Sequence, residues 1–167
     1  MQIALGRRGD YAVRAIICLA RSYGHGRRKA REIARDMGIP ERFLPQILAP
    51  FVRAGTLVAV AGPDGGYELA RPPAEITLLE VVEEAEGQTT SDHCTMRGGP
   101  CDWRNACAMH EPWKRAQAAL ASELQGTTFE ELAREHEAFL ERNGVATEPT
   151  PTRPASTPRR PRAARDA

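Results

Sequence analysis

The stretch GPDGG at residues 62–66 constrains the fold of this chain more than any other feature of its sequence. Glycine and proline adopt the backbone angles that tight turns need, so such a density of both is a strong turn signal. The apolar segment TLVAV lies before the turn at residues 56–60, and YEL alternates after it at residues 67–69. The pattern predicts a β-hairpin of two short strands.

Helical patterns lie before this hairpin. In each of them apolar residues recur every three or four positions and form one stripe. The patterns cover residues 10–23, 29–37 and 40–55. Gly38 stands at the position of a C-terminal cap, so a short turn separates the second helix from the third. This order, with the hairpin after it, predicts a winged helix-turn-helix.

Prolines limit the third helix. Pro40 can open it, because its fixed φ angle suits a first helical position. Pro45 is tolerated if the helix begins near Arg42, since it then lies in the first turn. Pro50 lies deeper and has no amide hydrogen to donate, which predicts a kink.

Further helical patterns follow at residues 78–85, 111–124 and 128–142. Thr77 and Thr128 are the expected N-caps, because each has a glutamate three residues later. The predicted fold class is therefore mostly α with a small β-hairpin. A fourth cysteine outside the loop described below, Cys18, falls in an apolar helical stretch and is predicted to be a small core residue.

The predicted organisation has three parts. Residues 1–75 form the winged helix-turn-helix domain, and residues 76–143 hold a cysteine loop and a long helix. Residues 144–167 combine repeated proline with arginine and few apolar side chains, which predicts a disordered tail.

The net charge of +1 hides an uneven distribution. Residues 1–56 hold 11 Lys and Arg against 4 Asp and Glu, whereas residues 57–144 hold 7 against 16. A basic N-terminal part favours a polyanionic partner, because Lys and Arg release counterions from phosphates. The alternative is an arginine-rich surface that is exposed to solvent and binds no partner.

Other classes of protein are disfavoured. No apolar run reaches the roughly 18 residues of a membrane helix, and the N-terminus lacks a signal-peptide core, so we expect a cytoplasmic protein without a membrane partner. No general acid, base or activated nucleophile is arranged in the sequence, so we expect no enzyme activity.

A winged helix-turn-helix places the start of its recognition helix in the major groove of DNA and its hairpin tip on the backbone or in the minor groove. Arg42 could pair with guanine or phosphate, Glu41 with cytosine and Gln46 with adenine. The candidate DNA-binding residues are Arg28, Lys29, Pro40, Glu41, Arg42, Phe43, Gln46, Gly62 and Pro63.

Cys94, Cys101 and Cys107 follow the spacing C-x6-C-x5-C on a polar, glycine-containing loop. Such a loop is a poor place to bury free thiols, and thiolates are ligands for iron–sulfur clusters and zinc. The spacing does not decide between the two, and a four-cornered site needs a fourth ligand. His110, with two residues between it and Cys107, is the near candidate, and Asp10 is the distant one.

Several blocks of this sequence resemble the Rrf2 family of transcription regulators. They are the first-helix block DYAVRA (10–15), the recognition block GIPERFLPQIL (38–48), the wing GPDGGYELA (62–70), ITLLEVVE (76–83) before the cysteine loop, and TTFEEL (127–132) near the end of the family domain. The resemblance covers roughly residues 1–135, and the wing together with the three cysteines makes it specific.

The resemblance implies a homodimer in which the long dimerisation helix, residues 111–125, crosses its partner. It also implies an iron–sulfur cluster, [2Fe-2S] or [4Fe-4S], held by Cys94, Cys101 and Cys107. In some members the fourth ligand is an acidic residue at the position of Asp10, which the other subunit donates. Others use a histidine at the position of His110. This sequence has both residues.

We therefore expect a DNA-binding transcription regulator, a repressor, whose binding to a double-stranded operator is controlled by a cluster that senses iron, nitric oxide or redox state. One alternative is a zinc- or thiol-based regulator on the same scaffold. The other, from a different class, is a small iron–sulfur protein of electron transfer or cluster delivery.

Overall fold

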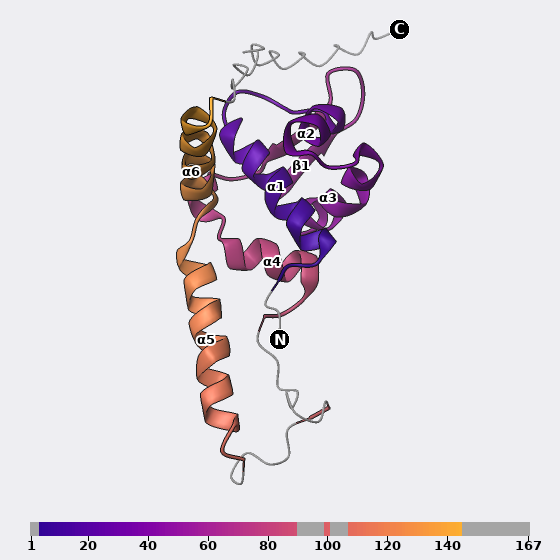
Figure 1. Cartoon of the computed structure of the whole chain (residues 1–167). Helices are drawn as coiled ribbons and strands as arrows, with labels where there is room; N and C mark the ends of the chain where they lie inside the picture. Colours follow the sequence, from indigo (N-terminus) through magenta and orange to yellow (C-terminus); the bar gives the residue numbers. More distant parts are fainter. Residues whose placement is uncertain (1–3, 90–98, 101–106, 145–167) are drawn as a thin grey trace, which may run out of the picture.

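The computed structural model describes residues 4–89, 99–100 and 107–144. Within these ranges the elements follow the predicted order, and the fold is mostly helical with one two-stranded hairpin (Figure 1). The bounds are α1 (Arg7–Arg21), α2 (Ala30–Met37), η1 (Glu41–Phe43), α3 (Leu44–Arg53), β1 (Leu57–Val60), β2 (Gly66–Leu69), η2 (Pro73–Glu75), α4 (Leu78–Glu86), α5 (His110–Gly126) and α6 (Phe129–Arg142). The predicted tail beyond residue 144 lies outside the described residues.

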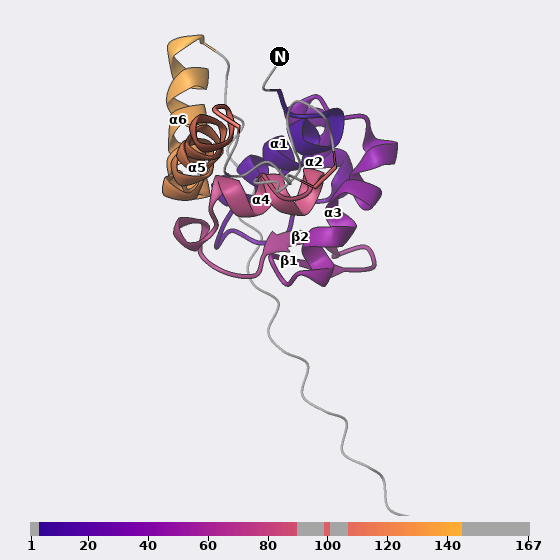
Figure 2. The ribbon, with the colours of Figure 1, turned by 90° about the horizontal axis from the view of Figure 1, so that it is seen from below.

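Helix α1 is the centre of the packing. Figures 1 and 2 show α6 on one side of it and α2 and α3 on the other, while α4 crosses beside it. Ala12, Ala15 and Ile16 of α1 are completely buried, because neighbours close on the helix from several directions. Small alanine side chains let those helices approach closely.

The hydrophobic core does not stop at the predicted domain boundary after residue 75. One cluster joins Ile16, Leu48 and Leu57 to Ile76, Val81 and Phe129. The second predicted part therefore shares its core with the helix-turn-helix through α4 and α6.

The turn between α2 and α3 forms as its residues predict. Gly38 ends α2 with φ 63° and ψ 34°, a left-handed conformation that glycine adopts without strain. The third predicted helix is divided, however: a 3-10 turn precedes α3. Pro45 takes the second position of α3, where its missing amide hydrogen costs no helical hydrogen bond. Pro50 lies inside α3 without ending the helix, and the kink expected there stays a prediction.

The wing is an antiparallel pair, with Leu57 opposite Leu69 and Val60 opposite Gly66. The segment before α2 extends this small sheet, because Arg28 and Tyr67 exchange backbone hydrogen bonds of 2.9 and 2.8 Å. This contact fixes the wing to the helix-turn-helix.

Helices α4 and α6 begin side by side. Thr77 and Thr128 each accept a hydrogen bond from the amide three residues later, which confirms both predicted N-caps. A backbone bridge joins the two threonines, with Leu78 N donating to Thr127 O at 2.9 Å. The start of α6 is thus fixed against the start of α4.

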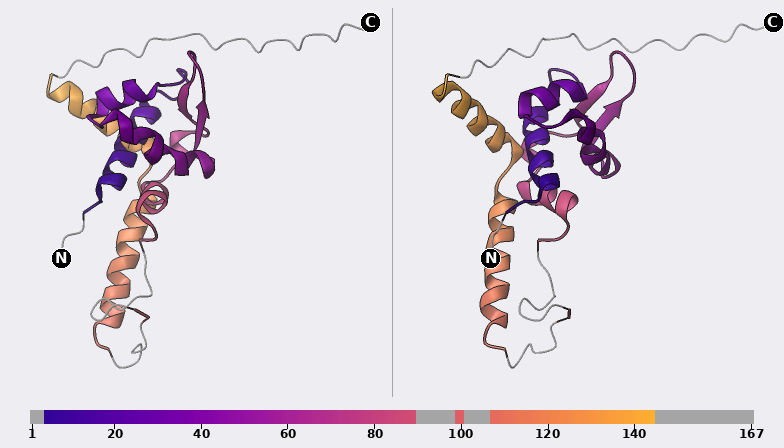
Figure 3. Two further views of the ribbon diagram at one scale, coloured as in Figure 1. Left: turned by 90° about the vertical axis from the view of Figure 1, so that its right-hand side faces the viewer. Right: turned by 45° about the vertical axis from the view of Figure 1, so that its right-hand side comes forward.

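Helix α5 projects away from this body (Figures 1 and 3). It has 17 residues and none of them is buried. Trp113, Leu120 and Leu124 are half-buried along one stripe, whereas Ala116 is exposed. Its described contacts are mainly with α4. Among the described residues, no helix is both long and apolar enough to cross a membrane.

Gly66 tests the junction between the wing and the segment before α2. Its φ angle is +148°, and a Cβ there would lie 2.5 Å from the carbonyl oxygen of Arg28. We expect Gly66→Ala to lower the free energy of unfolding by about 1–3 kcal/mol, as measured by urea denaturation. The control is Gly126→Ala, where a Cβ meets open space and a small gain is expected. Equal stability of the two variants would contradict this account.

Candidate nucleic-acid interface and cysteine loop

The turn η1 and helix α3 have one buried and one exposed face. Leu44, Ile47 and Leu48 enter the core. The exposed residues are Pro40, Glu41, Arg42, Pro45 and Gln46. Phe43, which the sequence placed among the DNA-binding residues, is half-buried beneath them. The structure thus brings most of the predicted base-reading side chains to one accessible surface at the start of the recognition helix.

The tip of the wing is also accessible. Gly62 and Pro63 are exposed, and Gly65 N donates to Gly62 O at 3.0 Å to close the turn. Gly65 itself is buried, and a Cβ there would collide with the backbone of Val60 and Ala61. Glycine at this position lets the tip fold tightly.

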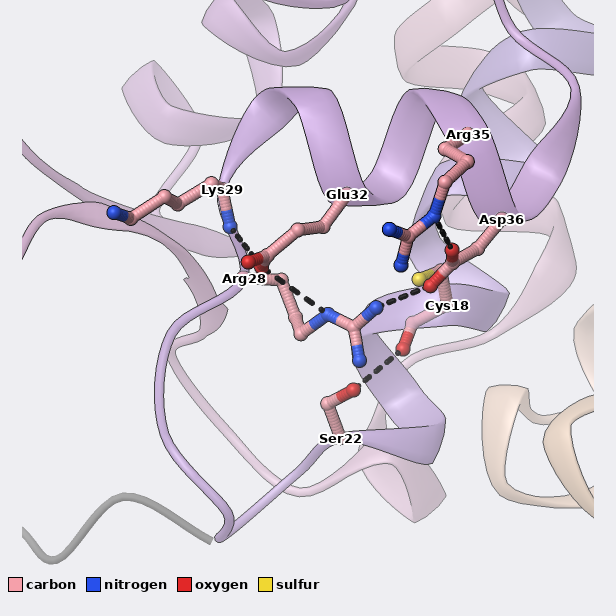
Figure 4. Close-up of polar contacts among 7 residues, drawn as sticks. All are labelled: Cys18, Ser22, Arg28, Lys29, Glu32, Arg35 and Asp36. Atoms are coloured by element: carbon pink, nitrogen blue, oxygen red, sulfur yellow. Dashed lines mark hydrogen bonds and ion pairs between the residues drawn. The ribbon is translucent and has the colours of Figure 1, made fainter. Parts of the chain in front are cut away.

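Arg28, predicted to contact DNA, has another set of partners. Figure 4 shows its guanidinium turned toward α2, where it pairs with Asp36 and lies 3.7 Å from Glu32 Oε2 through Nε. Its side chain is only 11% exposed. The Lys29 side chain extends away from this group (Figure 4). Of the two basic residues predicted here, Lys29 is therefore the more available to a phosphate.

Cys18 lies behind this ion pair, in the core. It is 3% exposed, and burial raises the pKa of its thiol, although nearby Arg28 acts in the opposite direction. A thiol with a raised pKa is a poor nucleophile and metal ligand. The prediction of a core role for Cys18 is confirmed.

The cysteine loop connects α4 to α5. Cys107 carries a free, half-buried thiol, and His110 begins α5 with its amide donating to Cys107 O at 3.1 Å. The two candidate ligands therefore lie on one turn. Cys94 and Cys101 lie outside the described residues. Within the described residues no three His, Cys, Asp or Glu side chains gather around a common metal position.

Asp10 lies in the first turn of α1. The helix starts three residues earlier, with Gly6 as its N-cap. Arg14 Nε donates to Asp10 Oδ1 at 2.8 Å, and Arg14 Nη2 donates to Oδ2 of the same carboxylate. The hydrogen bonds to Asp10 raise the pKa of Arg14 despite its partial burial. A metal ligated by Asp10 would compete with Arg14 for these carboxylate oxygens.

The early start of α1 depends on Glu86, which sequence reasoning missed. Gly9 N donates to Glu86 Oε1 at 2.6 Å, so a carboxylate at the end of α4 supplies the cap that Gly6 lacks. A Cβ at Gly6 or Gly9 would lie within 2.8 Å of that carboxylate. These two glycines are the only sequence signal of the contact. Its effect is to fasten the helix of Asp10 to the end of α4, where the cysteine loop begins.

Comparison with known proteins agrees with this arrangement. The family profile for Rrf2, described as "Iron-dependent Transcriptional regulator", matches residues 5–135. Protein aau3 of Rhizobium meliloti is 35% identical over 131 residues, which is 78% of this chain and 84% of that protein.

The chain belongs to the Rrf2 family. Solved structures of similar proteins include the global cysteine regulator CymR of B. subtilis, with a TM-score of 0.69, 28% identity, and coverage of 80% of this chain and 98% of that one. The IscR of T. potens has a TM-score of 0.65 and 25% identity, with coverage of 83% and 92%.

Membership makes the chain a helix-turn-helix transcription regulator that binds DNA, in a family of regulators rather than enzymes. The resemblance inferred from the sequence blocks is confirmed, as is the winged-helix fold. The Rrf2 match ends within α6, so α5 and the start of α6 belong to the family domain.

Replacing Glu86 tests whether it caps α1 in this Rrf2 protein. We expect Glu86→Ala to lower the free energy of unfolding by about 1 kcal/mol, because Gly9 loses its acceptor. Glu86→Gln keeps an acceptor without the charge, so its free energy of unfolding should lie between those of the wild type and Glu86→Ala. Chemical denaturation measures all three. Glu84→Ala removes an exposed carboxylate from the same helix and is the control; an equal loss there would disprove the capping role.

Proposed function

We propose that this chain is a repressor that binds an operator as a homodimer and whose affinity for DNA is set by an iron–sulfur cluster on the cysteine loop. The observation that carries the DNA-binding part is the exposed surface of η1 and the start of α3, with the exposed wing tip on the same domain. A major groove admits a helix, and the first residues of a recognition helix reach base edges.

The chemistry of the exposed side chains supports base reading. Arg42 offers a donor fork for guanine or phosphate, Gln46 can pair with adenine, and Glu41 can accept from cytosine. Lys29 and the wing tip would contact the sugar–phosphate backbone of the DNA. The excess of basic residues in positions 1–56 supplies the attraction to phosphate.

The exposed α5 supports the homodimer. An isolated helix of this size is marginal in water, and α5 has a half-buried apolar stripe but no buried residue. A second copy of the same helix would cover that stripe. Two recognition helices could then meet half-sites about one turn of DNA, roughly 34 Å, apart.

The donor set supports the cluster. Cys94, Cys101 and Cys107 would hold it, with His110 or Asp10 as the fourth ligand, and thiolates are the usual ligands of iron–sulfur centres. When bound, such a cluster reacts with nitric oxide and oxidants and depends on iron supply. The family description as iron-dependent agrees with this assignment. The chain's own part is to present Cys107 and His110 on one turn at the root of α5.

Removing the arginine at the recognition turn tests the DNA-binding surface. We expect Arg42→Ala to weaken binding to a duplex selected by the wild-type protein from a randomised pool by about 1–3 kcal/mol, the size of one base contact. Fluorescence anisotropy at fixed salt measures it. Arg134→Ala removes an exposed arginine from α6 and is the control. If Arg42→Ala binds the selected duplex as tightly as the wild type does, Arg42 is not a contact to that duplex.

Removing a cysteine tests the cofactor. Protein purified without oxygen should absorb broadly near roughly 400 nm and contain iron and sulfide, because charge transfer from sulfur colours such clusters. We expect Cys101→Ala to lose this absorption and Cys18→Ala, which changes a core thiol, to keep it. Retention of the absorption in Cys101→Ala would refute the assignment. Colourless wild-type protein with about one zinc per chain would indicate the zinc-based alternative instead.

A further inference from the structure

A row of stacked side chains connects α1 to the exposed Arg42. The rings of Tyr11 and Phe43 stack with their centroids 6.5 Å apart and their planes 19° from parallel. The guanidinium carbon of Arg42 lies 4.7 Å from the centroid of the Phe43 ring. A half-buried aromatic pair thus forms the surface on which Arg42 rests.

Arg14 supports the inner end of this row. Its guanidinium carbon lies 5.7 Å from the centroid of the Tyr11 ring. The same guanidinium pairs with Asp10 and donates from Nη1 to Met37 O, the last carbonyl of α2, at 3.2 Å. One arginine therefore holds Tyr11 on α1 in a fixed relation to the end of α2, just before the turn that leads to Phe43.

We infer that Tyr11 is a positioning residue of the DNA-reading surface. It holds the Phe43 ring in place, and that ring fixes the orientation of the Arg42 side chain in the free protein. The inference rests on the proposed role of Arg42 as a DNA contact. An arginine on the surface has many rotamers, and fixing one of them on binding costs entropy. A cation above an aromatic face is attracted to it, which restricts those rotamers in the free protein.

The same contacts would also be consistent with packing alone, since Tyr11 and Phe43 both adjoin the core. The two roles differ in what they change. Loss of packing lowers stability and weakens all DNA binding alike. Loss of positioning lowers the preference for the selected sequence, and only while Arg42 is present.

Two variants of Tyr11 separate these roles in the full-length chain. Tyr11→Phe keeps the ring, whereas Tyr11→Leu keeps apolar bulk but removes the aromatic face. We measure the Kd for the selected duplex and for an unrelated duplex of equal length at one salt concentration. We expect Tyr11→Phe to match the wild type. Tyr11→Leu should raise the Kd for the selected duplex by about two- to fivefold, the size of an exposed cation–π contact. It should raise the Kd for the unrelated duplex much less.

A double-mutant cycle with Arg42→Ala completes the test. We expect Tyr11→Leu to have almost no further effect when Arg42 is absent, and Phe43→Leu to repeat the behaviour of Tyr11→Leu. Equal rises in both Kd values, or a full effect of Tyr11→Leu without Arg42, would overturn the inference while leaving the proposed function intact. If Arg42→Ala alone changes neither Kd, the reading role of Arg42 and this inference both fall. Thermal unfolding of every variant verifies that it is folded.

Discussion

The burial of α1 is the constraint on which the rest of the structure depends. Ala12 and Ala15 are completely enclosed, and α2, α3, α4 and α6 all contact this one helix. Interiors pack as densely as crystals, so neighbours seated on such small side chains have little freedom to shift. The position of the recognition helix is therefore determined by the same packing that positions α4, the helix that leads into the cysteine loop. This is why the core crosses the boundary predicted at residue 75.

Helix α5 presents the opposite case. It is attached at one end to the cysteine loop and at the other, through residue 127, to the start of α6, but no residue of it is buried. A change in the loop can move such a helix without disrupting the core around α1. In the proposed dimer, that separation would let the loop alter the spacing of two rigid reading domains, rather than unfold either of them.

Local sequence signals predicted most of the fold, and distant contacts account for what they missed. The GPDGG turn, the left-handed Gly38 and the caps Thr77 and Thr128 act over a few residues, so the sequence alone identifies them. The start of α1 depends on Glu86, 77 residues away. The sequence also does not reveal the partners of Arg28, because a basic run indicates charge but not the carboxylates that pack against it in the fold.

The two candidates for the fourth ligand make different demands on the chain. His110 lies at the root of α5, and its use would leave Arg14 with Asp10 and Met37. Both carboxylate oxygens of Asp10 already accept hydrogen bonds from Arg14, so a metal bound there would compete with at least one of them. Arg14 also supports Tyr11, and a weakened pair would loosen the row that ends at Arg42. An Asp10 ligand given to the cluster of the other subunit would therefore act on the reading surface of the subunit that donates it, whereas a His110 ligand would act through α5 of the subunit that holds the cluster.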